Sequence, residues 1–163
     1  MRGTDKYLMV FAGGIVALII VALVVATMQP DRTYVDDDGP ESVVHNYLIA
    51  LEEGDYERAY TYLSPDLEGY PPNVRAFITD IHNNQWQFPT EENPTALTLL
   101  SVDEGDGWAD ATVRMTVNYG GGLFGLNRNS DEFHLQLEQH DQDWKIAGGE
   151  RLFVYCWSDA NCR

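Results

Sequence analysis

An uninterrupted apolar segment near the N-terminus constrains this chain more than any other feature. Residues 7–28, YLMVFAGGIVALIIVALVVATM, contain no charged side chain. As a helix that rises about 1.5 Å per residue, this segment would extend about 33 Å, enough to cross a hydrocarbon core of about 30 Å. Residues 1–28 are therefore predicted to be a cytoplasmic N-terminus and one transmembrane helix. A cleaved secretory signal is the alternative, although its apolar region is usually shorter, about 7–15 residues.

The flanking charges predict the orientation of this segment. Arg2 and Lys6 precede it, whereas Arg32 follows it among several aspartates. Because basic residues are retained on the cytoplasmic side of a membrane, we expect the N-terminus in the cytoplasm. The remainder of the chain is then expected outside the cytoplasm, in the periplasm of a bacterial inner membrane protein.

The two cysteines of the chain favour the same compartment. Cys156 and Cys162 enclose a short polar loop, CWSDANC, near the C-terminus. A pair at this spacing predicts a disulfide formed under oxidising conditions, with free thiols as the alternative.

The C-terminal domain is strongly acidic. Residues 41–163 hold 21 Asp and Glu against seven Lys and Arg, a net charge of −14. Such a surface repels the phosphates of nucleic acids, so nucleic acid is excluded as a partner. It also repels anionic lipid headgroups, so we expect the lipid bilayer to be contacted through the N-terminal helix alone.

Residues 29–40 are predicted to be a linker, and residues 41–163 are long enough for one domain with its own core. Three helices are expected in the first half, each with one apolar stripe of period 3.6. They cover residues 41–53, 55–63 and 71–84. The second half alternates apolar and polar residues, which is typical of strands at 97–102, 109–117, 133–137 and 144–155, with a bulge at Gly148-Gly149. Helices followed by a strand meander predict an α+β fold with the helices on one face of an antiparallel sheet.

These residues resemble a known superfamily. The segment PESVVHNYLIALEEGDYERAYTYLSPDL is similar to the start of an NTF2-like (SnoaL-like) domain, and the closing DQDWKIAG is similar to its last strand. The resemblance covers most of residues 41–157. It implies a cone of three helices packed on a curved antiparallel sheet. It leaves function open, because the superfamily includes dehydratases, isomerases, binding modules and inert scaffold domains.

The sequence predicts no catalytic residues, no metal ligands and no cofactor. Enzymes of this superfamily place Asp, His, Tyr or Arg inside the cone, whereas here Asp110, Arg114 and His134 share the polar phase of their strands. An exposed cross-strand contact is expected for Asp110 and His134, with a catalytic dyad as the alternative. The remaining histidines, His45, His82 and His140, are scattered without metal-binding spacing, and are expected at the surface or in structural roles.

Two apolar features indicate contacts with other proteins. Leu123, Phe124 and Leu126 lie at a glycine-rich hairpin tip, where large apolar side chains are unusual. They are expected to contact a partner protein, with the bilayer or their own domain as alternatives. In the apolar segment, Gly13 and Ala17 form one small-xxx-small pair, and Ala22 and Ala26 form another on nearly the opposite face. Such pairs let helices pack closely, so we expect integral membrane subunits as neighbours.

We therefore expect a non-catalytic, single-span accessory subunit of a larger bacterial membrane complex, which stabilises that complex or docks onto it. By analogy, the complex is a respiratory or photosynthetic electron-transfer assembly, for example of the alternative complex III type. No obligatory small molecule is expected. A membrane-tethered protein that binds a small apolar ligand is one alternative function. A hydrolase or isomerase with a cryptic pocket dyad is the other.

Overall fold

The computed structural model describes residues 11–21, 33–89, 95–122 and 125–162. It divides into two units, Met1–Thr33 and Tyr34–Arg163, and we call the second unit the head. In the first unit, residues 11–21 are helical. Within the described residues, no helix has both the length and the apolar character that a membrane crossing requires. The rest of the predicted span, residues 7–10 and 22–28, lies outside the described residues.

Three α-helices form close to where the sequence predicts them. They are α2 (Pro40–Glu53), α3 (Tyr56–Thr61) and α4 (Val74–Asn83). Local signals set their ends. The carboxylate of Asp55 accepts a hydrogen bond from the Arg58 N–H (3.1 Å) at the start of α3, and Asn73 caps α4 in the same way through Ala76 N–H (3.0 Å). Gly54 ends α2 with φ +71°, a left-handed conformation that favours glycine.

Four antiparallel strands follow the helices in the order β1-β2-β3-β4. Their bounds are β1 (Thr95–Glu104), β2 (Trp108–Gly122), β3 (Gly125–His140) and β4 (Asp143–Gly149). β3 and β4 are joined by Asp141 and Gln142, which both have positive φ, as a two-residue hairpin turn requires. The register shifts between Gln136 and Leu137, opposite Gly148 and Ile146, next to the predicted bulge. Short 3-10 helices complete the head: η1 (Gln85–Gln87), η2 (Tyr155–Trp157) and η3 (Ala160–Cys162).

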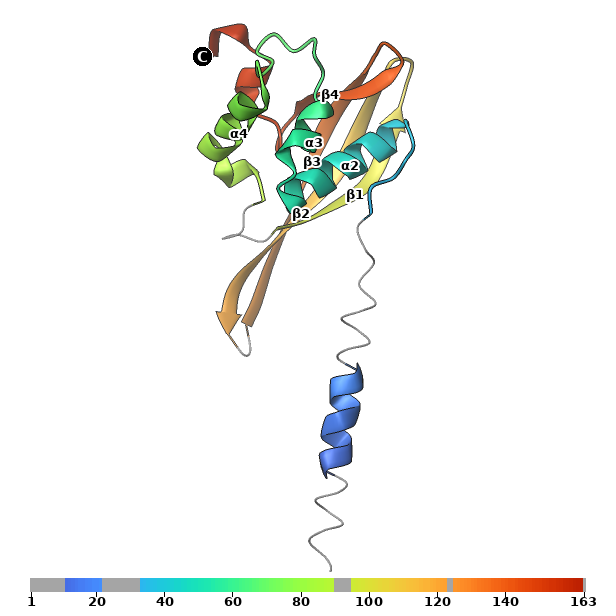
Figure 1. The fold of residues 1–163 in the computed structure, drawn as a ribbon, viewed down its shortest axis with the longest axis vertical. Helices are drawn as coiled ribbons and strands as arrows, with labels where there is room; N and C mark the ends of the chain where they lie inside the picture. Colours follow the sequence, from blue (N-terminus) through green and yellow to red (C-terminus); the bar gives the residue numbers. More distant parts are fainter. Residues whose placement is uncertain (1–10, 22–32, 90–94, 123–124, 163) are drawn as a thin grey trace, which may run out of the picture. The chain divides into compact units, whose positions relative to one another are not determined.

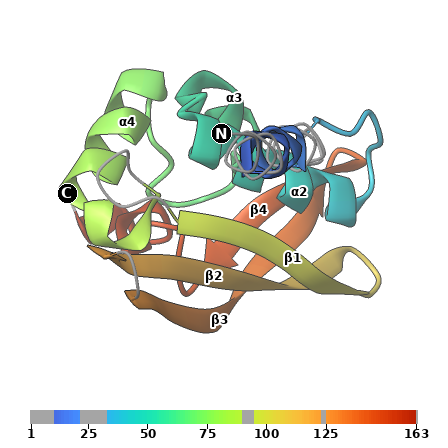
Figure 2. The same cartoon turned by 90° about the horizontal axis from the view of Figure 1, so that it is seen from below.

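The helices of the head cover one face of the sheet, as Figures 1 and 2 show. The predicted phase of the strands is confirmed, because the apolar side chains of β2 and β3 point into the core between the two layers. Ala111, Val113, Phe133 and Leu135 are fully or almost fully buried there. The fold is therefore α+β with an antiparallel sheet, the architecture that the NTF2-like resemblance implies.

The prediction that the last strand continues through Leu152 to Tyr155 is wrong. β4 ends at Gly149, and Leu152 has φ +56°, which an extended strand does not allow. The chain turns there and enters the core as an irregular segment that leads into η2. We call residues 152–157 the C-terminal plug. Its side chains Leu152, Phe153, Val154 and Trp157 are buried.

The predicted linker, residues 29–40, partly belongs to the head, which begins at Tyr34. The buried Asn46 side chain on α2 binds the backbone of Val35 twice: its Oδ1 accepts from Val35 N–H (2.8 Å) and its Nδ2 donates to Val35 C=O (2.8 Å). The Tyr34 hydroxyl donates a hydrogen bond to Glu53 (3.0 Å). The guanidinium of Arg58 lies 3.5 Å from the centre of the Tyr34 ring. We call residues 34–38 the stalk, and these contacts the stalk clamp. They fix the chain on α2 before the first helix of the head begins.

The packing of the C-terminal plug predicts a steric requirement at Gly69. A Cβ atom on Gly69 would lie 1.9 Å from the backbone oxygen of Cys156. Gly69→Ala should therefore lower the free energy of unfolding by about 1–3 kcal/mol in denaturant titrations. Glu68→Ala, at the exposed neighbouring position, is the control and should change it by less than about 0.5 kcal/mol. Equal stability of the two variants would contradict the plug's close approach to this loop.

Candidate functional site

The interior of the cone, where enzymes of the resembled superfamily hold their substrates, is occupied by the chain itself. The indole of Trp157 is fully buried, stacked on Phe77 of α4 (5.0 Å between ring centres) and edge-on to Phe153 (5.2 Å). Its Nε1–H donates to Asp80 on α4 (2.9 Å). The plug thus packs its aromatic side chains against α4 in the core of the head.

The polar groups at this interior are paired. Tyr47 of α2 is fully buried, and its hydroxyl donates to the backbone oxygen of Leu152 (2.5 Å). Burial raises the pKa of Tyr47, so the phenol stays protonated and keeps this donor. Among the described residues, every buried side-chain nitrogen or oxygen has a hydrogen-bond partner.

Asp110 and His134 meet on the other face of the sheet, which no helix of the described head covers. His134 Nδ1 lies 2.6 Å from Asp110 Oδ1, and both side chains are solvent-exposed, at 51% and 32%. The hydrogen bond to Asp110 is the largest cause that raises the pKa of His134 above its ordinary value. The neighbouring pairs Arg114–Glu132 (2.6 Å) and Thr116–Ser130 (3.0 Å) continue this polar row. The predicted exposed cross-strand contact is confirmed.

The other histidines lie apart from one another. His140 at the end of β3 pairs with Asp66 (2.7 Å) and so ties the β3–β4 hairpin to the loop after α3. His82 is exposed and meets Tyr56 edge-on (6.3 Å), while His45 is half-buried on α2. Among the described residues, no group of three His, Cys, Asp or Glu side chains is placed to hold a metal ion.

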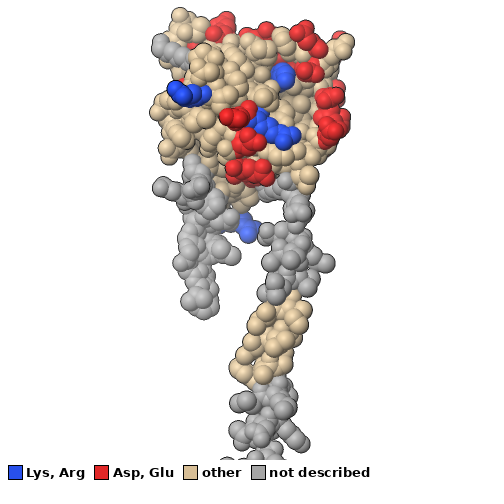
Figure 3. Space-filling model, in the orientation of Figure 1, with Lys and Arg blue, Asp and Glu red and all other residues tan. Residues whose placement is uncertain are grey.

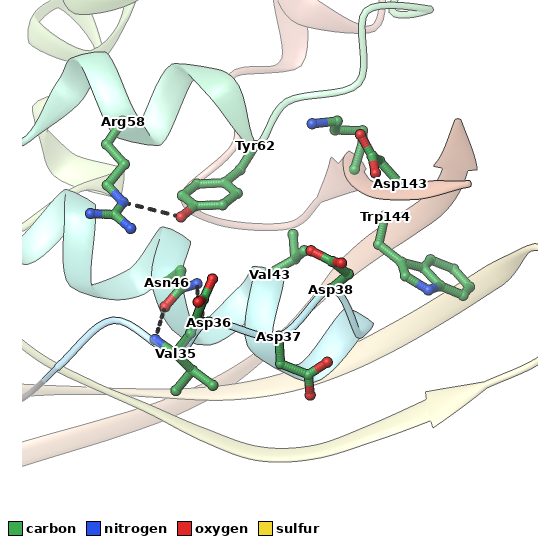
Figure 4. A pocket seen from close by; sticks show the side chains of 11 residues that line it. Val35, Asp36, Asp37, Asp38, Val43, Asn46, Arg58, Tyr62, Asp143 and Trp144 are labelled. Carbon is green, nitrogen blue, oxygen red and sulfur yellow. Dashed lines mark hydrogen bonds between the residues drawn. The ribbon is translucent and has the colours of Figure 1, made fainter. Parts of the chain in front are cut away.

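A surface cleft of about 230 Å³ lies beside the stalk clamp. Figure 4 shows residues from two of its sides: Asp36, Asp37 and Asp38 precede α2, while Arg58 lies on α3 and Tyr62 directly follows that helix. Asp143, Trp144 and Lys145 of β4 also line it, together with Val35, Val43 and Asn46. Arg58 already donates to the Tyr62 hydroxyl (3.3 Å), and Lys145 donates to the backbone oxygen of Thr61 (3.1 Å). Both cations of the cleft thus already donate a hydrogen bond within the head, and the one from Lys145 joins β4 to the end of α3.

The sequence analysis did not identify the stalk clamp. The available signal was Asn46 itself, an amide side chain between the apolar residues Val44 and Leu48 of α2. It is only 5% exposed, and such a buried amide needs partners for both of its polar atoms. The backbone of Val35 supplies both.

Cys156 and Cys162 form a disulfide in the structure, with their Cα atoms 5.1 Å apart. The predicted pair is therefore capable of forming the bond. It closes a loop that begins within η2 and ends at η3, next to the buried Trp157.

Most of the predicted partner contacts fall outside the described residues. Leu123 and Phe124 lie there, as do Ala22 and Ala26, and the side chain of Leu126 is not described either. Gly13 and Ala17 lie in the helix at residues 11–21, where both are exposed. The structure therefore leaves the predicted contacts of these residues as predictions.

Comparison with known proteins identifies similar folds but no family. No protein-family model matches the chain, and no curated protein matches it. A SEC-C motif containing protein from Rhodopseudomonas palustris aligns with 71% of this chain and 80% of its own, at 19% identity and a TM-score of 0.50. A protein from Thiobacillus denitrificans, described as a calcium/calmodulin-dependent protein kinase type II association domain, aligns with 70% and 95%, at 10% identity and a TM-score of 0.50. An NTF-2 like protein from Shewanella oneidensis aligns with 66% and 90%, at 11% identity and a TM-score of 0.45. At these identities the likeness concerns the fold alone.

The plug predicts a large difference between two aromatic residues of the same 3-10 turn. Trp157 is fully buried, whereas Tyr155 is 71% exposed. Trp157→Ala should lower the free energy of unfolding by about 3–5 kcal/mol, because it leaves a cavity among Phe77, Phe88 and Phe153. Tyr155→Ala, the matched control, should cost less than about 0.5 kcal/mol. Similar losses for both, measured by thermal and denaturant unfolding, would show that the plug does not support the fold.

The outer face predicts a titration that depends on one hydrogen bond. Asp110→Asn should lower the pKa of His134 toward its ordinary value of about 6.5, measured by NMR of the imidazole signals. Because the folded-state pKa of His134 is raised, the pair stabilises the fold below about pH 6.5, and this contribution is lost as the pH rises through the folded-state pKa. Glu57→Gln on α3 removes the same charge on the helix-covered side. Equal shifts in Asp110→Asn and Glu57→Gln would contradict the pairing.

Proposed function

We propose that this chain is a non-catalytic, membrane-anchored accessory subunit of a larger bacterial membrane protein complex, in which the head serves as an interaction domain. The observation that carries the proposal is the C-terminal plug buried in the core. Trp157 occupies the interior, and its indole N–H is paired with Asp80. Because side chains of the plug pack in this interior, we expect the head to contact other molecules through its surface.

The helix at residues 11–21 supports the membrane anchor. Its described side chains are all exposed, and they include Phe11 (73%) and Leu18 (70%). A helix that is apolar on every side is unfavourable in water, since each exposed apolar side chain forgoes transfer from water. Together with the apolar run over residues 7–28, this favours a lipid or protein environment around it.

The proposed location is the bacterial inner membrane, with the N-terminus in the cytoplasm and the head in the periplasm. Arg2 and Lys6 before the apolar run favour this orientation, and the disulfide fits an oxidising compartment. The proposed partners are integral membrane subunits. Respiratory and photosynthetic electron-transfer complexes, including those of the alternative complex III type, are the assemblies in which this chain should first be sought.

The surface cleft beside the stalk clamp favours a second candidate, a tethered protein that binds a small ligand. The cleft offers four carboxylates, from Asp36, Asp37, Asp38 and Asp143, together with Arg58 and Lys145. A polar ligand with a positive group suits this lining better than the apolar ligand that the sequence suggested. The hydrolase or isomerase alternative has less support, because the Asp110–His134 pair is exposed on the outer face.

A pair of neighbouring glycines gives the test of the leading proposal. An added Cβ on Gly13 or on Gly14 meets no heavy atom of the described chain within 4 Å, so leucine at either position has room within the subunit. Gly13 forms a small-xxx-small pair with Ala17, four residues further on, whereas Gly14 is followed at the same distance by the large Leu18. Gly13→Leu should therefore disrupt packing against a neighbouring helix, while Gly14→Leu is the matched control.

We expect the wild-type chain to purify from its native membranes, in mild detergent, with other integral membrane proteins. Gly13→Leu should reduce the recovery of those proteins several-fold, and Gly14→Leu should leave it close to the wild-type value. Recovery of the wild-type chain alone would reject the accessory-subunit proposal. Equal recovery with both variants would reject the role of the Gly13 and Ala17 face.

A further inference from the structure

The two edge strands of the sheet, β4 and β1, differ in whether another segment pairs with their outward-facing backbone groups. The outer edge of β4 is covered by residues 62–64: Ile146 N–H donates to Tyr62 C=O (2.8 Å), and Ser64 N–H donates to Ile146 C=O (2.8 Å). The outer edge of β1 has no such strand beside it in the described part of the head. The strand order β1-β2-β3-β4 makes β1 an edge, and an edge strand presents backbone donors and acceptors to any extended chain.

One hydrogen bond shows which peptide groups of β1 face outward. Leu97 N–H donates to the Glu52 carboxylate of α2 (2.7 Å), so it points away from β2. Peptide groups of an antiparallel strand alternate in direction, so the N–H of Leu99 points outward as well. The register is irregular between Leu99 and Ser101. After this irregularity Val102 pairs with Ala111, whose peptide group has the same orientation in β2 as those of the residues that pair with Leu97 and Leu99. Its N–H therefore also faces outward, and no other described element donates to or accepts from either group.

The charged side chains of α2 and β1 are all acidic. α2 and β1 contain five carboxylates and no Lys or Arg; the acidic residues are Glu41, Glu52, Glu53, Asp103 and Glu104. Glu41, His45 and Glu52 lie within about 40° of one another around α2, and the contact of Glu52 with Leu97 directs that stripe toward the open edge. On the face of the head seen in Figure 3, acidic side chains cover more of the surface than basic ones, at its centre, its top and its right side.

We propose that the open edge of β1 is the docking site for an extended, basic segment of a partner protein, which adds a fifth strand to the sheet. The partner's backbone pairs with Leu99 and Val102, and its alternate side chains on the α2 side carry Lys or Arg opposite Glu52 and its neighbours. A second copy of this chain is a poor occupant, because it brings the same carboxylates to the contact and two domains of charge −14 repel each other. The inference rests on the proposed interaction function and names the surface that performs it.

The test uses the full chain in detergent micelles at low salt, with a synthetic peptide of about ten residues that alternates lysine and valine. Two control peptides are matched to it: one has N-methyl groups on alternate residues, which keeps the charge but removes backbone donors, and the other has glutamate in place of lysine. Binding is measured by fluorescence anisotropy. Hydrogen exchange at the Leu99 and Val102 amides reports where the peptide lies.

We expect the lysine peptide to bind at least about tenfold more tightly than either control, and to slow exchange at both amides. Leu99→Pro removes an outward N–H at a position where an edge strand tolerates proline, and should weaken binding to a similar degree. Glu52→Gln keeps an acceptor for Leu97 but removes the charge, so it should weaken binding of the lysine peptide alone. If Leu99→Pro does not fold, the exchange data and the peptide pair decide.

Three results would overturn the proposal. Equal binding of the N-methylated peptide would show that charge alone attracts the peptide, without strand pairing. Protection of amides other than those of β1, or no binding at all, would place the partner elsewhere. Slower exchange at Leu99 and Val102 with rising protein concentration, without peptide, would identify a second copy as the occupant. Each result is independent of the Gly13→Leu experiment, so failure of the edge and failure of the accessory-subunit proposal are distinguishable.

Discussion

The burial of one indole joins the C-terminal plug to α4, which lies far from it in the sequence. Trp157 stacks on α4 through Phe77 and pairs with Asp80, 77 residues earlier in the chain. The plug that carries it is held from the other side by Tyr47 of α2, whose hydroxyl reaches Leu152. An aromatic side chain of this size contributes several kcal/mol by burial, a large fraction of the net stability of about 5–15 kcal/mol typical of a domain. The helices and the sheet therefore depend on the last residues of the chain for a complete core.

The sheet, in contrast, could be predicted from local pattern. Alternation along β2 and β3 follows from a sheet with one buried face, so Val113 and Phe133 could be assigned to the core, and Asp110 and His134 to the outer face, before their register was known. The same reasoning failed at Leu152–Tyr155. A short apolar run is compatible with a strand or a buried loop, and its conformation here depends on Tyr47, 105 residues away. Periodicity carries no information about a contact of that kind.

The stalk clamp is a second set of contacts that the periodicity of the sequence does not predict. An α-helical stripe drawn through Val44, Tyr47, Leu48 and Leu51 leaves Asn46 off the apolar side, and such a residue is ordinarily assigned to the surface. It is buried because the preceding chain folds back over it, and the aspartates of that chain, Asp36, Asp37 and Asp38, remain exposed. A segment rich in like charges was expected to extend as a linker. Two amide hydrogen bonds and the Arg58–Tyr34 contact hold it on the head instead.

This clamp limits how far the head can stand from the anchor proposed above. If the span ends at Met28, five residues remain before Tyr34, and even a fully extended chain of that length covers only about 17 Å. The Debye length at physiological ionic strength is about 8 Å, so under this proposal the attachment point at Tyr34 would lie within roughly two screening lengths of the membrane surface. Repulsion from anionic lipids would then act on the head, whose residues 34–163 carry a net charge of −17. A basic partner beside the acidic edge of β1 would offset that repulsion, so the short stalk, the acidic surface and the open strand favour a head that lies against another protein of the same membrane.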